Sequence, residues 1–103
     1  MNTKKSSTRK FLEKLTGGPV TLGRLLESIR LGEESSQAQF AKRLHISRSH
    51  LNDIEKGNKA VSPERAARFA RALGHSEERF VELALQSLVD EAGLKLKVMV
   101  DVA

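Results

Sequence analysis

The chain has 103 residues, the size of one small domain, and it contains no cysteine. No apolar run is long enough to span a bilayer or to serve as a signal peptide, so we expect a cytoplasmic protein with no membrane partner. Four Phe are its only large aromatic residues, which argues against a protein that stacks single-stranded bases. Three scattered histidines and no glycine-rich phosphate loop predict no enzyme activity, no cofactor and no metal site.

The net charge of +5 is unevenly distributed along the chain. Residues 1–14 carry a net charge of +4, residues 37–71 carry +5, and residues 76–92 carry −4. A molecule with one basic and one acidic side is typical of proteins that bind a phosphate backbone. Charge alone leaves RNA open as an alternative to duplex DNA.

The first predicted segment is a basic arm over residues 1–18, either disordered or with one helical turn at Phe11, Leu12 and Leu15. A domain over residues 19–93 follows, in which five polar residues predict the starts of five helices. The helices are expected after Thr21, over 37–44, over 48–56, from Pro63 to Gly74, and from Ser76 to about Ala92. We therefore expect an all-α fold of five helices.

The C-terminal segment 94–103, LKLKVMVDVA, changes from the helical period to strict alternation. This pattern predicts a β-strand, the only one in the chain. A lone strand cannot satisfy its own backbone groups. We expect it either to fray or to pair with another chain and serve dimerisation.

The segment QAQFAKRLHISRSHLNDIEK, residues 37–56, has the spacing of two short helices that cross at a steep angle. Its apolar positions are Phe40, Leu44, Ile46, Leu51 and Ile54. Such a pair leaves the outer face of the second helix free to enter a major groove about 12 Å wide. The pattern resembles the helix-turn-helix of lambdoid phage repressors, Cro proteins and Xre-type regulators. The resemblance covers roughly Leu22 to Leu85 and implies a five-helix, lambda-repressor-like DNA-binding domain in a bacterial, nucleoid-associated protein.

One position departs from the family pattern. The turn between the two helices usually holds Gly, and here it holds His45. A left-handed backbone at His45 costs roughly 1 kcal/mol. A metal-binding role for His45 is the alternative, but no second His or Cys stands at ligand spacing.

The first turn of the second motif helix is expected to contact DNA bases. Arg48 can donate to guanine, Ser49 can reach either strand, Asn52 suits adenine, and Asp53 suits cytosine. Phosphate contacts are expected from five further residues, Gln37, Arg43, His50, Asn58 and Lys59. For Arg43 and Lys59 the alternative is an ordinary solvated charge.

The resemblance also implies that Arg30, late in the first helix of the domain, pairs with Glu55, late in the third. A partly buried pair would fix the recognition helix against the bundle. The alternative is two unrelated surface charges.

Dimerisation is expected through the last helix and the strand, because that helix carries two apolar stripes and a helix of this kind usually has two neighbours. The predicted dimerisation residues are Val81, Leu85, Leu88, Leu94, Leu96, Val98, Val100 and Val102. The tail is similar to the C-terminal strand of HipB-type antitoxins. We therefore expect a homodimeric, autoregulatory repressor on a palindromic double-stranded DNA operator. The alternative is an antitoxin, of HipB or HigA type, whose main task is to neutralise a toxin protein.

Overall fold

The computed structural model describes residues 20–103, and these form five helices. The helices are α2 (Leu22–Gly32), α3 (Gln37–Arg43), α4 (Arg48–Glu55), α5 (Pro63–Leu73) and α6 (Glu77–Glu91). The prediction of a five-helix, all-α domain is confirmed. The expected basic arm of residues 1–18, with its turn at Phe11 to Leu15, lies outside the described residues.

Local sequence determines where the helices begin. Thr21 and four serines, Ser36, Ser47, Ser62 and Ser76, each accept a hydrogen bond from the backbone N–H three residues on. Ser36 also donates its own backbone N–H to the Gln39 side chain at 3.1 Å, which completes a capping box. Each predicted helix start is therefore confirmed.

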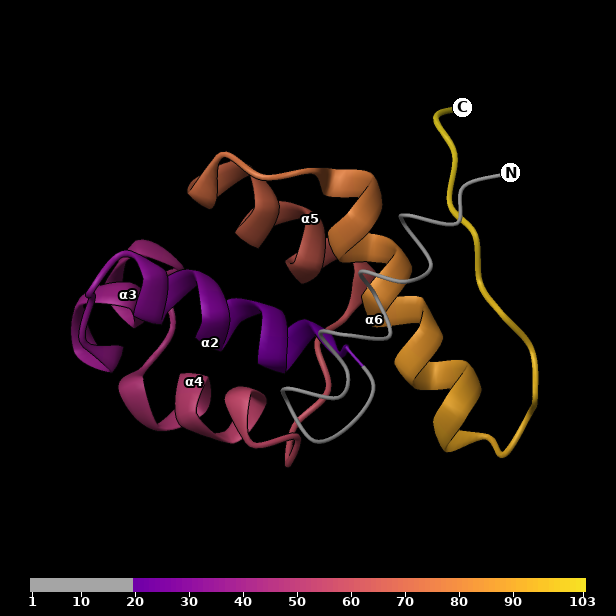
Figure 1. The fold of residues 1–103 in the computed structure, drawn as a ribbon, viewed down its shortest axis with the longest axis horizontal. Helices are drawn as coiled ribbons and strands as arrows, with labels where there is room; N and C mark the ends of the chain where they lie inside the picture. Colours follow the sequence, from indigo (N-terminus) through magenta and orange to yellow (C-terminus); the bar gives the residue numbers. More distant parts are fainter. Residues whose placement is uncertain (1–19) are drawn as a thin grey trace.

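One hydrophobic core joins the helices. In Figure 1, α2 lies between α4 and α5, and α6 runs past the end at which α2 begins. The largest fully buried side chains come from four helices and are Phe40, Leu26, Leu51, Ile54 and Phe80. Because α2, α3, α4 and α6 all contribute to this core, the orientation of α4 depends on the whole bundle.

Helices α2 and α4 approach each other closely at Gly23, near the start of α2. A Cβ atom built on Gly23 would lie 2.0 Å from the carbonyl oxygen of Ile54 in α4. Only a residue without a side chain allows this backbone contact. Gly23 is thus the point at which α2 supports the recognition helix directly.

The turn between α3 and α4 contains His45 in the left-handed region, at φ 58°. The His45 N–H donates to Lys42 O, and the Ile46 N–H donates to Ala41 O. Ala41 is buried where the two helices cross. A helix-turn-helix therefore forms with histidine at the position where the resemblance implies glycine.

The prediction of a C-terminal strand is wrong for the chain as described, because residues 20–103 contain no strand. The tail runs back beside α6 (Figure 1), and side chains of that helix bind its backbone. Gln86 Nε2 donates to Leu96 O at 2.8 Å, and Val98 N–H donates to Gln86 Oε1 at 2.7 Å. Val100 N–H donates to Glu82 Oε1 at 3.4 Å. Since residues 20–103 offer no strand for the tail to pair with, α6 supplies partners that a β-ladder would otherwise provide.

In the part of the chain that the structure describes, no helix is long and apolar enough to cross a membrane.

Candidate DNA interface

Helix α4 divides into a buried and an exposed face. Leu51, Ile54 and Glu55 are buried, whereas Arg48 and Ser49 in its first turn are exposed. Asn52 and Asp53, one turn later, are half-buried. The four side chains predicted to contact bases therefore all reach the surface of one short helix, with none of them in the core.

Gln37, the first residue of α3, connects this surface to the interior. Its Nε2 donates to Asn52 Oδ1 and to Glu55 Oε1, both at 3.1 Å. Its Oε1 accepts a hydrogen bond from Arg48 Nη1, also at 3.1 Å. The Gln37 amide thus fixes two side chains of the exposed face relative to a buried carboxylate. The sequence predicted Gln37 only as a phosphate contact, because a side-chain network between two helices has no sequence signature of its own.

The structure pairs Arg30 with Glu55 in a bidentate ion pair. Arg30 Nε donates to Glu55 Oε2 at 2.8 Å, and Nη2 donates to Oε1 at 3.0 Å. The Glu55 side chain is 1% exposed and that of Arg30 is 12% exposed. Arg30 Nη1 also donates to Ser35 O at 3.2 Å. The Glu55 hydrogen bond raises the pKa of Arg30 above its ordinary value, so the guanidinium stays charged.

The loop after α4 folds back onto Asp53. The N–H groups of Asn58 and Lys59 both donate to Asp53 O, at 2.8 and 3.3 Å. Lys59 Nζ lies 3.9 Å from Asp53 Oδ2, and both Asn58 and Lys59 are exposed. This loop therefore presents a polar and a basic side chain directly beside the exposed face of α4. Because the Asp53 carboxylate lies next to this lysine, the predicted base contact of Asp53 would have to compete with it.

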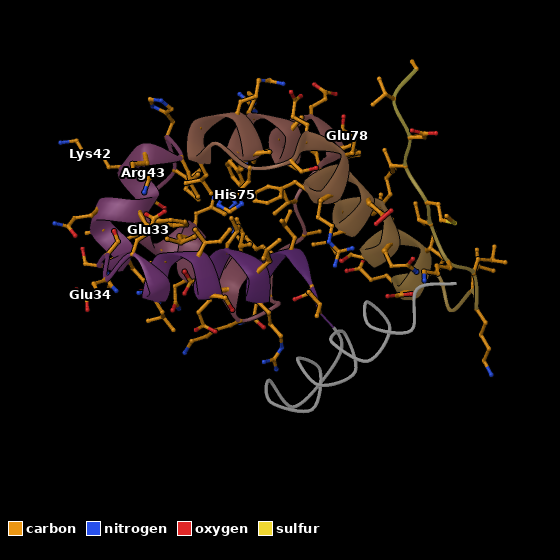
Figure 2. The ribbon with its side chains drawn as sticks, turned by 45° about the horizontal axis from the view of Figure 1, so that its top comes forward. Glu33, Glu34, Lys42, Arg43, His75 and Glu78 are labelled. Atoms are coloured by element: carbon orange, nitrogen blue, oxygen red, sulfur yellow. The ribbon has the colours of Figure 1, made fainter. Side chains whose placement is uncertain are left out.

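Arg43 lies at the opposite end of α3 from Gln37. Its Nη1 forms an ion pair with Glu33 Oε1, and its guanidinium lies 5.6 Å from the ring centre of Phe40. Figure 2 shows Arg43 and Glu33 close together, whereas Lys42 points away from the bundle. The predicted phosphate contact of Arg43 would have to compete with these two interactions.

His50 lies on the side of α4 that faces α5. The distance from its Nε2 to Arg65 Nη1 is 3.5 Å. Burial, and next the neighbouring Arg65, lower the pKa of His50 below its ordinary value. Arg65 was not singled out in the sequence, because its proximity to the recognition helix depends on how α5 packs.

The predicted dimerisation residues lie on α6 and the tail, and they differ in how far they are exposed. Val81 packs against the core, Leu85 is half-buried, and Leu88 is 47% exposed. In the tail, Leu94, Leu96 and Val102 are exposed, while Val98 and Val100 are half-buried.

In the described residues, no group of three His, Cys, Asp or Glu side chains could hold a metal ion, and this includes the surroundings of His45.

A family model described as a helix-turn-helix domain matches residues 21–83. A search of curated proteins found no match. Among solved structures, the chain is similar to the clp gene regulator ClgR from Corynebacterium glutamicum, with a TM-score of 0.52 and 30% sequence identity. That similarity covers 70% of this chain and 77% of the other. Because the family model spans more than half of its residues, the chain belongs to the helix-turn-helix family of DNA-binding transcription regulators.

Proposed function

We propose that the protein is a repressor that binds a palindromic operator in double-stranded DNA as a homodimer and regulates its own promoter. The observation that carries this proposal is the Gln37 amide, which holds Arg48 and Asn52 at the surface of α4 and is itself bonded to the buried Glu55. A recognition surface needs side chains that are ordered before binding, since ordering them on DNA costs free energy.

The four side chains of α4 proposed to contact bases offer complementary chemistry to base edges. The Arg48 guanidinium can donate to guanine, and the Ser49 hydroxyl can donate or accept. The Asn52 oxygen accepts from Gln37, which leaves its two N–H groups available as donors. The Asp53 carboxylate can accept from cytosine, in competition with Lys59, whose Nζ lies 3.9 Å away.

The phosphate contacts belong to the two ends of this surface. Gln37 stands at the N-terminus of α3 and would donate its backbone N–H, because both hydrogens of its Nε2 are bonded to Asn52 and Glu55. Asn58 and Lys59 stand in the loop after α4. We also propose that Arg43 and His50 contact phosphates of the DNA, although Arg43 is paired with Glu33 in the free protein. Contacts of this type fix the register of the helix on the duplex and contribute no sequence information.

Dimerisation is proposed through α6 and the tail, where Leu88, Leu94, Leu96 and Val102 leave apolar surface in water. A two-fold dimer would bring two copies of this surface together and place two α4 helices on successive half-sites. Removal of residues 94–103 is expected to leave the helices folded, because the core side chains lie upstream. Sedimentation should show a shift toward monomer, and operator affinity should fall more than half-site affinity.

Selection of bound duplexes from a random pool tests the function as a whole. A palindromic consensus, bound at nanomolar protein and not displaced by excess RNA, is the expected outcome. Equal recovery of all sequences, or preferential binding of RNA, would contradict it. A reporter driven by the protein's own promoter then distinguishes repression from activation.

The second candidate function is an antitoxin of HipB or HigA type, favoured by the exposed apolar tail. Met99 is 83% exposed and Leu96 is 62% exposed, which suits a segment that a protein partner covers. Expression of the neighbouring gene product alone and together with this protein tests it. Growth arrest that this protein relieves, and that the variant lacking residues 94–103 does not, would support neutralisation.

A further inference from the structure

We propose that Arg65 and Arg68 of α5 form a second phosphate-binding site, on the flank of α4 opposite to Gln37. This inference rests on the proposed function, because its ligand is the backbone of the same DNA duplex. Neither residue was among the contacts expected from the sequence.

The first argument is position. Gln37 contacts Arg48 and Asn52, which lie on the flank of α4 that faces α3. His50 lies on the other flank, and its Nε2 is 3.5 Å from Arg65 Nη1. The guanidinium of Arg65 is therefore beside the first turn of the recognition helix, across that helix from Gln37.

Arg68 lies one turn further along α5, on the same side of that helix. Arg65 and Arg68 line a small hollow of about 90 Å³ together with His45 and Ile46 of the helix-turn-helix turn. Two cationic side chains thus border the turn from which α4 begins. The hollow itself is too small for a ligand larger than a few atoms, so we assign binding to the guanidinium groups at its rim.

The second argument is charge. Arg68 is exposed and has no ion-pair or hydrogen-bond partner among residues 20–103, and Arg65 has no carboxylate partner there. Arg71 on the same helix is different, since its Nη1 pairs with Glu77 Oε1 at 2.7 Å. Arg43, expected from the sequence to bind phosphate, is paired with Glu33. Arg65 and Arg68 are therefore cations beside the motif whose charge no carboxylate of residues 20–103 compensates.

The geometry of duplex DNA supplies the reason for a site on each flank. The major groove is about 12 Å wide and is bordered by the two phosphate backbones. A helix in this groove therefore has a phosphate backbone on either side of it. The phosphate contact proposed for Gln37 belongs to one of these two backbones. Arg65 and Arg68 present planar donor groups to the other, and guanidinium binds phosphate oxygens in bidentate fashion.

The test is the salt dependence of binding. Arg65→Gln and Arg68→Gln should each lower the slope of log K against log salt by about 0.9, and the double variant by about 1.8. The loss should be the same for cognate and random duplexes, because phosphate carries no sequence information. Arg65→Lys should restore the slope. Arg71→Gln is the matched control, with the same change of charge on the same helix and an unchanged slope expected.

Phosphate ethylation interference locates the contact. Ethylation of phosphates on the flank opposite to Gln37 should weaken binding of the wild-type protein and have no effect on the double variant. Circular dichroism verifies that each variant remains folded. The second site would be overturned if Arg65→Gln and Arg68→Gln both kept the wild-type salt slope while Lys59→Ala lowered it. That result would leave the proposed function standing. Failure of the wild-type protein to bind any duplex would instead overturn the function itself.

Discussion

Gly23 in α2 and Ile54 in α4 meet backbone to backbone, so closely that a Cβ atom on residue 23 would lie 2.0 Å from the Ile54 carbonyl oxygen. Real Cβ atoms do not come this close to a backbone oxygen, and the obstacle is main chain that cannot rotate away. The pairing of α2 with the recognition helix therefore depends on one hydrogen atom in place of a methyl group.

Gly23→Ala is accordingly expected to destabilise the fold by about 3 kcal/mol or more, at the upper end of the cost of overpacking. Gly32→Ala, in the same helix but with nothing within 4 Å of the added atom, should stabilise it by roughly 0.5–1 kcal/mol through helix propensity. Urea denaturation of the two variants gives both values. Equal stabilities would show that α2 and α4 can move apart without cost.

The left-handed backbone at His45 leads to a second prediction. His45 has φ 58° and is exposed, so His45→Gly should stabilise the protein by up to about 1 kcal/mol by relieving the steric cost of a Cβ. His45→Val, which adds a branch at that Cβ, should destabilise it. Thermal melts of the three proteins should rank them in the order Gly, His, Val. A lower melting temperature for the Gly variant would show that unfolded-chain entropy dominates here.

The ion pair of Arg30 with Glu55 provides a third prediction. Removing one partner leaves a buried charge without compensation, so Arg30→Met or Glu55→Gln should each cost about 3–5 kcal/mol. Because Glu55 also accepts from Gln37, Glu55→Gln should in addition weaken operator binding more than Arg30→Met does. A double-mutant cycle isolates the pair. Additive losses in that cycle would mean that the two charges do not interact.

Arg48 allows a fourth prediction, on specificity. Arg48→Ala should lower affinity for the selected operator by roughly 1–3 kcal/mol and affinity for random duplex much less, because a bidentate base contact carries sequence information. Lys59→Ala should weaken both equally and reduce the salt slope by about 1. Fluorescence anisotropy over a salt series measures all four quantities. Equal losses on the two duplexes for Arg48→Ala would make Arg48 a phosphate contact.

The fifth prediction concerns pH. The pKa of His50 is lower in the folded protein than its ordinary value of about 6.5, first through burial and then through Arg65. The unfolded chain therefore binds a proton that the folded one does not, and stability is lost as pH falls through about 6.5 toward the lower folded value. Unfolding free energies measured from pH 7.5 to 5 should show this decline. His50→Gln should flatten it, and an unaltered slope in that variant would assign the decline to another group.

The helix starts could be predicted from the sequence because a serine or threonine cap acts on the N–H only three residues away. Features that depend on packing could not. Gly23 resembles an ordinary helical glycine until α4 is placed against it, and Arg65 resembles a surface charge until α5 brings it to His50. For the candidate site, the residue types on α4 were predictable, but the Gln37 network that orders them was not.

The tail shows the opposite error. Its sequence pattern is clear, but the structure that this pattern predicts does not form. Alternation at residues 94–103 predicted a strand, but a strand needs a paired neighbour and none lies within the described residues 20–103. Gln86 satisfies the backbone of Leu96 and Val98 instead. A side-chain amide has one donor and one acceptor group at the spacing of a peptide unit, which is why it can substitute for a neighbouring strand.

This substitution has a consequence for solubility. An extended segment has two edges, and a free segment with both edges open can add neighbours on each side without limit. In this tail Leu96 O, Val98 N–H and Val100 N–H are bonded to side chains of α6, so this edge is partly covered and the other edge is the more open to another chain. We therefore expect that only one further chain pairs with the tail. Gln86 and Glu82 in this way oppose open-ended, fibril-like stacking of the apolar tail.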